Sequence, residues 1–125
     1  MKVMVVDDDL GIRRLAKFIL NTSGIDVLLA PHGREALDLL TKDAADVIVL
    51  DLNMPVMDGY DFVHNLDETP GRPPIIILSG DRAEIARREL GAEASLRKPF
   101  RPDELITKVH EVSSSRSPDS EASAA

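Results

Sequence analysis

The feature that most constrains the fold is an alternation, repeated five times, between short apolar runs and stretches with helical spacing. Short apolar runs bounded by turn-forming or charged residues are typical of buried parallel strands. Parallel strands need long crossover connections, which are right-handed and lay helices on the faces of the sheet. The sequence therefore predicts an α/β fold with a parallel sheet and helices on both faces. The expected strands are residues 2–6, 25–29, 47–50, 75–78 and 94–97.

Apolar residues at helical spacing predict the helices between these strands. The first helix should pack one apolar face on the sheet: Ile12, Leu15, Ala16 and Ile19. Its basic residues are expected to point outward: Arg13, Arg14 and Lys17. Asp58 is expected to cap the third helix, and Gly91 to follow the fourth, at residues 83–90. Pro102 fits the first turn of the last helix.

Composition limits the class of protein further. A chain of 125 residues is long enough for one domain with a proper core, and its net charge of −7 argues against direct binding to nucleic acid or anionic membranes. It has no cysteine, no signal peptide and no apolar run of membrane-spanning length, so we expect a cytoplasmic protein. Residues 113–125 contain no apolar side chain larger than alanine. We therefore expect a domain over residues 1–112 and a disordered Ser/Ala-rich tail over 113–125.

The carboxyl ends of parallel strands share one edge, which is where open α/β sheets bind ligands. The residues expected at this edge are Asp7, Asp8, Asp51, Ser79 and Lys98. Crowded carboxylates repel one another, so one of them must hold a proton or a cation must lie nearby. Hard oxygen ligands suit Mg²⁺, for which Asp8, Asp51 and a backbone carbonyl near Asn53 are the expected direct ligands.

This set of groups can support phosphoryl transfer to a carboxylate. Asp51 can be the nucleophile that forms an aspartyl-phosphate, Lys98 can pair with a phosphoryl oxygen, and Ser79 can donate a hydrogen bond. Each residue also has a structural explanation: Asp51 as a cap, residues 7–9 as a cap cluster, Ser79 in a turn and Lys98 solvated. Their coincidence at one sheet edge favours the chemical interpretation.

Four motifs, in this order, resemble those of the receiver domain of bacterial response regulators. They are VVDDD at residues 5–9, VLDLNMPVMDG at 49–59, ILSG at 77–80 and KPF at 98–100. The resemblance covers Lys2 to about Val112 and identifies residues 1–112 as a receiver domain. It implies a flavodoxin-like doubly wound (βα)5 fold with sheet order 2-1-3-4-5.

The resemblance also implies a role for the acidic residues. Asp51 is expected to be the phosphoacceptor, receiving a phosphoryl group from a sensor histidine kinase or a phosphotransfer protein. Asp8, Asp51 and the backbone carbonyl of Asn53 are expected to bind Mg²⁺ directly, and Asp7 to act through water. Asn53 and Asp81 flank the expected phosphoryl group and are expected to tune its hydrolysis.

Further roles follow for the polar residues of the last strands. By resemblance, Ser79 moves toward the phosphoryl group, Lys98 pairs with it, and the Lys98–Pro99 peptide bond is cis. The sequence departs from the family three residues before Lys98, where Ser95 replaces the usual aromatic switch residue. The segment between Ser79 and Gly91 is also shorter than in chemotaxis regulators, so the fourth helix is expected to be stunted or irregular.

The resulting expectation is a signalling switch that supports its own phosphorylation and autodephosphorylation and turns over no separate substrate. It would act by binding a downstream protein that the sequence does not name, without touching nucleic acid or membrane. Four alternatives stay open: the receiver fragment of a longer transcriptional regulator, that of a hybrid kinase, a small aspartyl-phosphate phosphatase, and a degenerate receiver used only for interaction.

Overall fold

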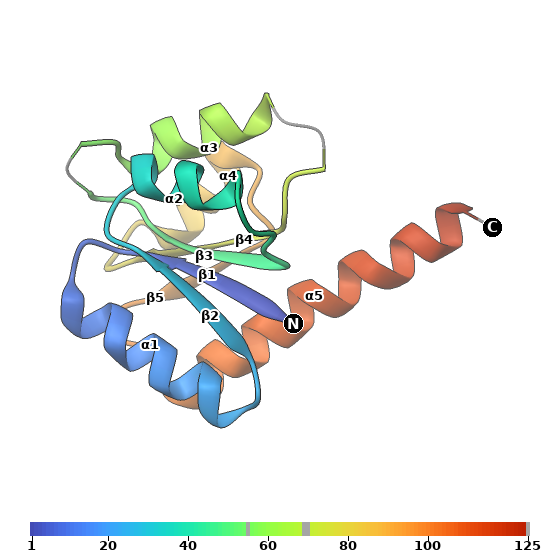
Figure 1. The fold of residues 1–125 in the computed structure, drawn as a ribbon, viewed down its shortest axis with the longest axis horizontal. Coiled ribbons are helices and arrows are strands. Elements are labelled where there is room, and N and C mark those ends of the chain that lie inside the picture. The colour runs from blue at the N-terminus through green and yellow to red at the C-terminus, as the bar shows by residue number, and fades with distance from the viewer. Residues whose placement is uncertain (55, 69–70, 125) are drawn as a thin grey trace.

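The structure, a computed structural model, describes residues 1–54, 56–68 and 71–124, and only the backbone of residues 115–124. Pro55 of the VLDLNMPVMDG motif and Ala125 of the predicted tail lie outside the described residues. Strands and helices alternate along the described chain (Figure 1). The strands are β1 Lys2–Val6, β2 Asp26–Ala30, β3 Val47–Asp51, β4 Ile75–Ser79 and β5 Ala94–Arg97. The helices are α1 Leu10–Thr22, α2 Gly33–Leu40, α3 Gly59–Asp67, α4 Ala83–Leu90 and α5 Pro102–Ala124.

The strands form a parallel sheet in the order β2-β1-β3-β4-β5. Figure 1 shows α1 and α5 on one face of this sheet, and α2, α3 and α4 on the other. The flavodoxin-like doubly wound fold with order 2-1-3-4-5 is therefore confirmed. Because all strands run the same way, the residues that follow β1, β3, β4 and β5 meet at one edge.

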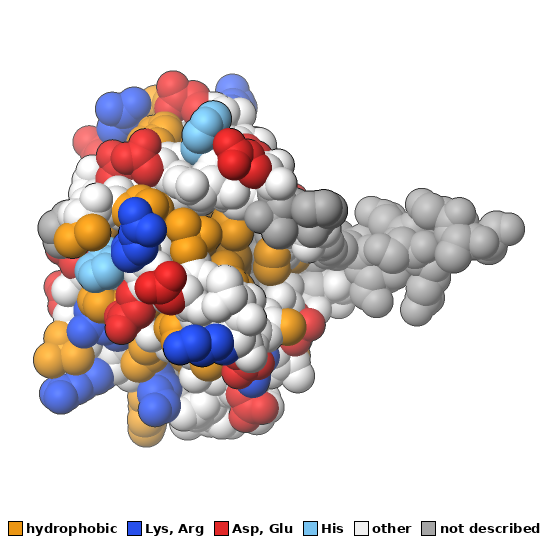
Figure 2. Space-filling view, turned by 45° about the horizontal axis from the view of Figure 1, so that its top comes forward, with side chains coloured by type: hydrophobic (Ala, Val, Ile, Leu, Met, Phe, Trp, Pro, Cys, Tyr) orange, Lys and Arg blue, Asp and Glu red, His pale blue; other side chains and the backbone are white. Residues whose placement is uncertain are grey.

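The surface carries both signs of charge. On the face seen in Figure 2, acidic and basic side chains are interspersed and hydrophobic side chains lie between them. Every helix in the described part of the chain is too short or too polar to traverse a bilayer.

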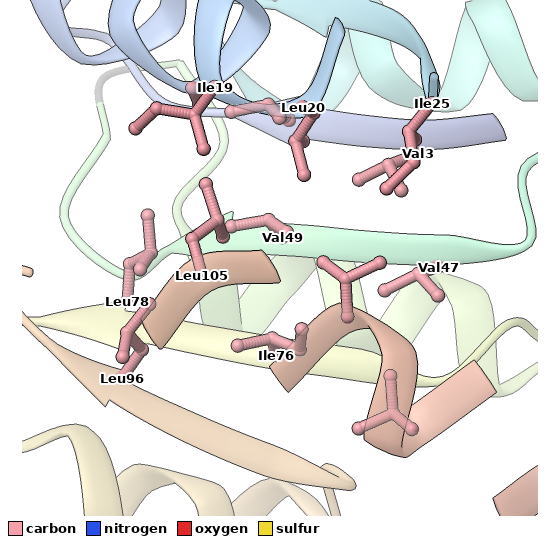
Figure 3. Close-up of a cluster of buried hydrophobic side chains, with 14 of the residues drawn as sticks. Val3, Ile19, Leu20, Ile25, Val47, Val49, Ile76, Leu78, Leu96 and Leu105 are labelled. Atoms are coloured by element: carbon pink, nitrogen blue, oxygen red, sulfur yellow. The ribbon is translucent and has the colours of Figure 1, made fainter. Parts of the chain in front are cut away.

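Alternate residues of each strand enter opposite halves of the core, as the pleat of a strand requires. Between the sheet and α1 with α5, Val49 and Leu78 pack against Leu20 and Leu105 (Figure 3). On the other face, Ile48 and Leu50 pack in a cluster with Phe62 of α3 and Ala36 of α2. Both faces of β3 and β4 are buried, which explains their unbroken apolar sequences.

Some helix ends have the caps that the sequence predicts. Asp9 caps α1 by accepting hydrogen bonds from the amides of Gly11 and Ile12. Asp58 caps α3, and Gly91 ends α4 in the left-handed conformation with φ of 66°. The fourth helix is short, as expected, with eight residues at the predicted positions 83–90. It is a regular α-helix, so the expectation of an irregular helix is wrong.

The predicted faces of α1 need two corrections. Leu15 is 44% exposed, and Leu20 is buried together with Ala16 and Ile19. Leu15 and Leu20 lie on opposite sides of the Ala16 position, and the docking angle of the helix selects Leu20. Arg13 does not point into solvent. It is half-buried and donates a hydrogen bond to the backbone carbonyl of Asp7, directly after β1.

The last helix continues through residues 113–124, where the composition predicts a disordered tail. Figure 1 shows this part projecting away from the sheet. An isolated helical extension has no tertiary packing to stabilise it, and Pro118 lacks an amide hydrogen for a helix interior. The disordered tail therefore stays a prediction, and amide hydrogen exchange of residues 113–124 would test it.

Candidate functional site

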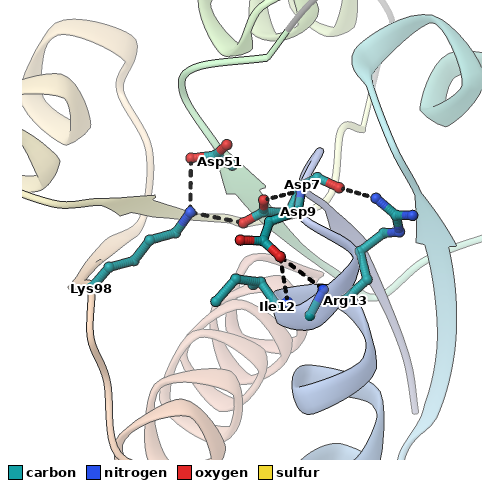
Figure 4. Close-up of polar contacts among 7 residues, drawn as sticks. Asp7, Asp9, Ile12, Arg13, Asp51 and Lys98 are labelled. Atoms are coloured by element: carbon teal, nitrogen blue, oxygen red, sulfur yellow. Dashed lines mark hydrogen bonds and ion pairs between the residues drawn. The ribbon is translucent and has the colours of Figure 1, made fainter.

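Three strands bring together the charged residues of the predicted site. Asp7 follows β1, Asp51 is the last residue of β3, and Lys98 follows β5. The Lys98 ammonium lies 2.9 Å from Asp7 Oδ2 and 3.2 Å from Asp51 Oδ1 (Figure 4). One cation thus joins two carboxylates from different strands, as the shared sheet edge predicts.

Asp7 is the most enclosed member of the site, with no exposed surface. Its Oδ1 atom accepts a hydrogen bond from the amide of Asp9 at 2.9 Å. Its Oδ2 atom faces Lys98 as an ion pair but accepts no well-aligned hydrogen bond from the described residues. A buried oxygen in this state retains the capacity to accept a hydrogen bond from a metal-bound water.

Asp51 is held where β3 passes into the loop before α3. It is 6% exposed, and Figure 4 shows its second carboxylate oxygen pointing away from Lys98. The amide of Gly59 donates to the carbonyl of Leu52 at 2.9 Å. A Cβ atom at Gly59 would lie 2.9 Å from Leu52 Cα and 3.0 Å from the Asp51 carbonyl oxygen. Glycine therefore allows α3 to begin directly against the end of β3.

The electrostatics of the site leave negative charge uncompensated. Burial and the neighbouring charge of Asp7 raise the pKa of Asp51 to about 6, although Lys98 opposes this shift. Burial alone would lower the pKa of Lys98, but its contacts with Asp7 and Asp51 prevail and the pKa is raised. Lys98 is therefore charged at neutral pH, while a second cation would relieve the repulsion between the carboxylates.

A divalent metal fits this donor set. One carboxylate oxygen from each of Asp7, Asp8 and Asp51 lies within 4.8 Å of the other two. Asp8 is exposed and the other two are buried, so the cluster opens to solvent on one side. Hard oxygen ligands with room for water suit Mg²⁺, and the spare acceptor on Asp7 Oδ2 suits a water ligand.

Ser79 ends β4 beside these residues and is 6% exposed. In the ladder, Asp51 pairs with Leu78, so Ser79 lies one residue beyond the partner of Asp51. Its carbonyl accepts a hydrogen bond from the amide of Lys98 at 2.9 Å. The predicted neighbourhood of Ser79 and Lys98 is thus built into the backbone. The Lys98–Pro99 bond is cis, as the resemblance implies.

Ser95 is bonded to α4, a contact that the sequence does not reveal. Its hydroxyl donates to Glu84 Oε1 at 3.0 Å, and Glu84 also accepts two hydrogen bonds from Arg87. Arg87 first, and Ser95 second, lower the pKa of Glu84 to about 2. The role of Ser95 as the switch position stays a prediction, as does tuning by Asn53 and Asp81, both exposed on loops after β3 and β4.

Comparisons with known proteins agree with this arrangement. The model of the family described as response regulator receiver domain matches residues 3–110. The response regulator MprA of Mycolicibacterium vanbaalenii is 35% identical over 122 residues, which are 95% of this chain and 53% of that protein. The chain spans about half the length of the curated relatives it matches.

Solved structures of response regulators are also similar to this chain, and the match covers nearly the whole of each. The chemotaxis response regulator CheY4 of Vibrio cholerae superposes with a TM-score of 0.82 and 36% identity, covering 89% of this chain and 97% of that one. The receiver domain of the Francisella response regulator 1452 superposes with a TM-score of 0.84 and 36% identity, covering 92% of this chain and 98% of that one.

Proposed function

This chain belongs to the response regulator receiver domain family, the signalling switches of two-component systems, and we propose that Asp51 is its phosphoacceptor. The observation that carries the proposal is the convergence of Asp7, Asp51 and Lys98, with Lys98 Nζ within 3.2 Å of both carboxylates. An aspartate at the sheet edge can accept a phosphoryl group, and a charged lysine beside it can pair with that group once it has arrived.

The chain's own residues can carry the transfer. A carboxylate oxygen of Asp51 attacks the phosphorus of a phosphohistidine, and an acyl phosphate bond forms. The P–N bond of the donor breaks, and its electron pair stays on the imidazole nitrogen. Lys98 then pairs with a phosphoryl oxygen in place of Asp51 Oδ1, and the Ser79 hydroxyl donates a hydrogen bond to another.

We assign the cofactor as Mg²⁺, held by Asp8, Asp51 and the backbone carbonyl of Asn53, with Asp7 acting through water. When bound, it would neutralise charge on the phosphoryl oxygens and carboxylates. Intact mass after incubation with acetyl phosphate tests this assignment. We expect one added phosphoryl group in MgCl₂ and none in excess EDTA. The same adduct in both conditions would contradict the metal requirement.

The first helix offers a surface for the donor. Leu10, Leu15 and Phe18 are 49%, 44% and 69% exposed, and Arg14 and Lys17 are exposed on the same helix. Exposed apolar side chains bordered by charges are typical of protein interaction sites. We propose that this face of α1 docks the histidine kinase or phosphotransfer protein. Arg13 is not part of this face, because its guanidinium is hydrogen-bonded to the backbone carbonyl of Asp7.

Reversing the charge of this face should separate docking from chemistry. Arg14→Glu with Lys17→Glu is expected to slow transfer from a phosphorylated histidine kinase about tenfold, because complementary charge steers association. Labelling by acetyl phosphate should be unchanged. Arg34→Glu with Lys42→Glu makes the same charge change at exposed positions of α2 and its end, and is the matched control. Equal slowing with both donors would show that the substitutions act on the phosphorylation site.

Whether the chain works alone or as part of a longer regulator is a separate question. The coverage of CheY4 supports a stand-alone receiver, and the coverage of MprA supports the receiver part of a longer response regulator. The length of the native reading frame distinguishes the two. Family membership also weighs against an aspartyl-phosphate phosphatase. The downstream partner, the cytoplasmic location and the lack of nucleic-acid or membrane binding stay predictions.

A further inference from the structure

Arg13 connects the first helix to the acidic end of β1. Its Nη1 atom donates a hydrogen bond to the backbone carbonyl of Asp7 at 2.8 Å. Figure 4 shows the guanidinium reaching back from α1 to this carbonyl. The side chain is half-buried, whereas its neighbour Arg14 is exposed.

Other residues hold the amide and the carboxylate of Asp7, and Arg13 holds its backbone carbonyl. The amide of Asp7 donates to the Ala30 carbonyl at 3.1 Å, which continues the ladder with β2. The carboxylate is held by the Asp9 amide and by Lys98. Arg13 holds the carbonyl, and therefore the plane of the peptide that joins Asp7 to Asp8.

The orientation of this peptide matters for the metal ligands. A peptide unit is planar, so the direction of the Asp7 carbonyl also sets where the amide and Cα of Asp8 begin. Asp8 is exposed, and its carboxylate completes the cluster with Asp7 and Asp51. Positioning of an exposed ligand therefore depends on its backbone, and a bond to that backbone can set metal affinity.

We propose that Arg13 is a positioning residue that holds the Asp7–Asp8 peptide and so presents the Asp8 carboxylate to a divalent cation. This inference rests on the proposed Mg²⁺ site. In this proposal Arg13 strengthens Mg²⁺ binding, whereas its positive charge alone would weaken it. A positive group beside three carboxylates disfavours a second cation, so removal of the charge alone would tighten Mg²⁺ binding.

The sign of the change in affinity distinguishes the two effects. Arg13→Gln removes the charge and shortens the side chain, and Arg14→Gln makes the same charge change on the adjacent exposed residue. We would titrate MgCl₂ into each full-length protein and follow the backbone amide resonances of residues 7–9 and 51–53. Arg13→Gln is expected to weaken Mg²⁺ binding about tenfold relative to wild type, as loss of an outer contact to a metal site does. Arg14→Gln should leave it unchanged or slightly tighter.

A conservative variant and a stability measurement complete the experiment. Arg13→Lys keeps a charged donor, so its affinity for Mg²⁺ is expected to be close to that of wild type. This comparison can be made even if Arg13→Gln does not fold. Tighter binding in Arg13→Gln would show that its charge alone acts. Lower thermal stability with wild-type affinity would reduce Arg13 to a structural contact. Either result would overturn the proposal while leaving the Mg²⁺ site in place. If the wild-type protein bound no Mg²⁺, the cofactor assignment and the role of Arg13 would both be wrong.

Discussion

Asp51→Asn is expected to raise the free energy of unfolding of the Mg²⁺-free protein by about 3 kcal/mol near pH 7.5. Burial and the charge of Asp7 raise the pKa of Asp51 from 3.8 to about 6 in the folded chain. Between these values the folded state holds a proton that the unfolded state has lost. Stability therefore falls as the pH rises from about 4 to about 6, and the full penalty is present above that range.

Urea unfolding in EDTA at about pH 4 and about pH 7.5 measures this effect. The free energy of unfolding of Asp51→Asn should exceed that of wild type only at the higher pH. At the lower pH the wild-type carboxyl group is protonated, and neutral asparagine resembles it. Asp38→Asn, at an exposed position of α2, controls for the loss of a carboxylate. A gain in stability that is the same at both pH values would show that Asp51 is not held in an unfavourable charged state.

Lys98→Met is expected to have the opposite effect, lowering the free energy of unfolding by about 3 kcal/mol without Mg²⁺ near pH 7.5. Asp7 is fully buried and Asp51 nearly so, and Lys98 contacts both. Removal of the cation leaves two enclosed carboxylates facing each other. Addition of MgCl₂ should recover part of the loss, because a divalent cation can replace the missing charge.

Two further variants serve as a control for the loss of a positive charge and as a test of coupling between Lys98 and Asp51. Lys42→Met removes a positive charge at an exposed position and should change stability by less than about 0.5 kcal/mol. In the double variant Lys98→Met with Asp51→Asn, the loss from Lys98→Met should be smaller than in wild type, since the two residues are in contact. If the effects of the two substitutions on the free energy of unfolding simply added, so that Lys98→Met cost as much in the Asp51→Asn background as in wild type, a shared electrostatic site would be contradicted.

The sheet and its functional edge could be predicted because their sequence signals are local. An unbroken apolar run such as Val47–Leu50, bounded by aspartates, has few alternatives to a buried strand. Once five such strands are parallel, the residues after them must meet. The common edge of the parallel strands therefore predicts that Asp7, Asp51 and Lys98 lie close together, whatever their side-chain conformations.

Contacts that depend on how elements dock could not be predicted in this way. Helical spacing alone predicts that Arg13 points outward, but its side chain is long enough to reach back to the Asp7 carbonyl once α1 is in place. His32 caps α2 by accepting a hydrogen bond from the Glu35 amide at 3.3 Å, a contact that the spacing of the residues does not indicate. The hydrogen bond from Ser95 to Glu84 joins β5 to α4, and the distance between these two residues depends on the tertiary structure.

The assignment of Asp51 as phosphoacceptor is the central claim, and the intact mass of wild type and Asp51→Asn tests it most directly. Both proteins are incubated with acetyl phosphate and MgCl₂, next to a receiver domain known to be labelled under the same conditions. We predict one added phosphoryl group on wild type and none on the variant. An adduct of equal yield on Asp51→Asn, or no adduct on wild type while the reference receiver is labelled, would contradict the claim.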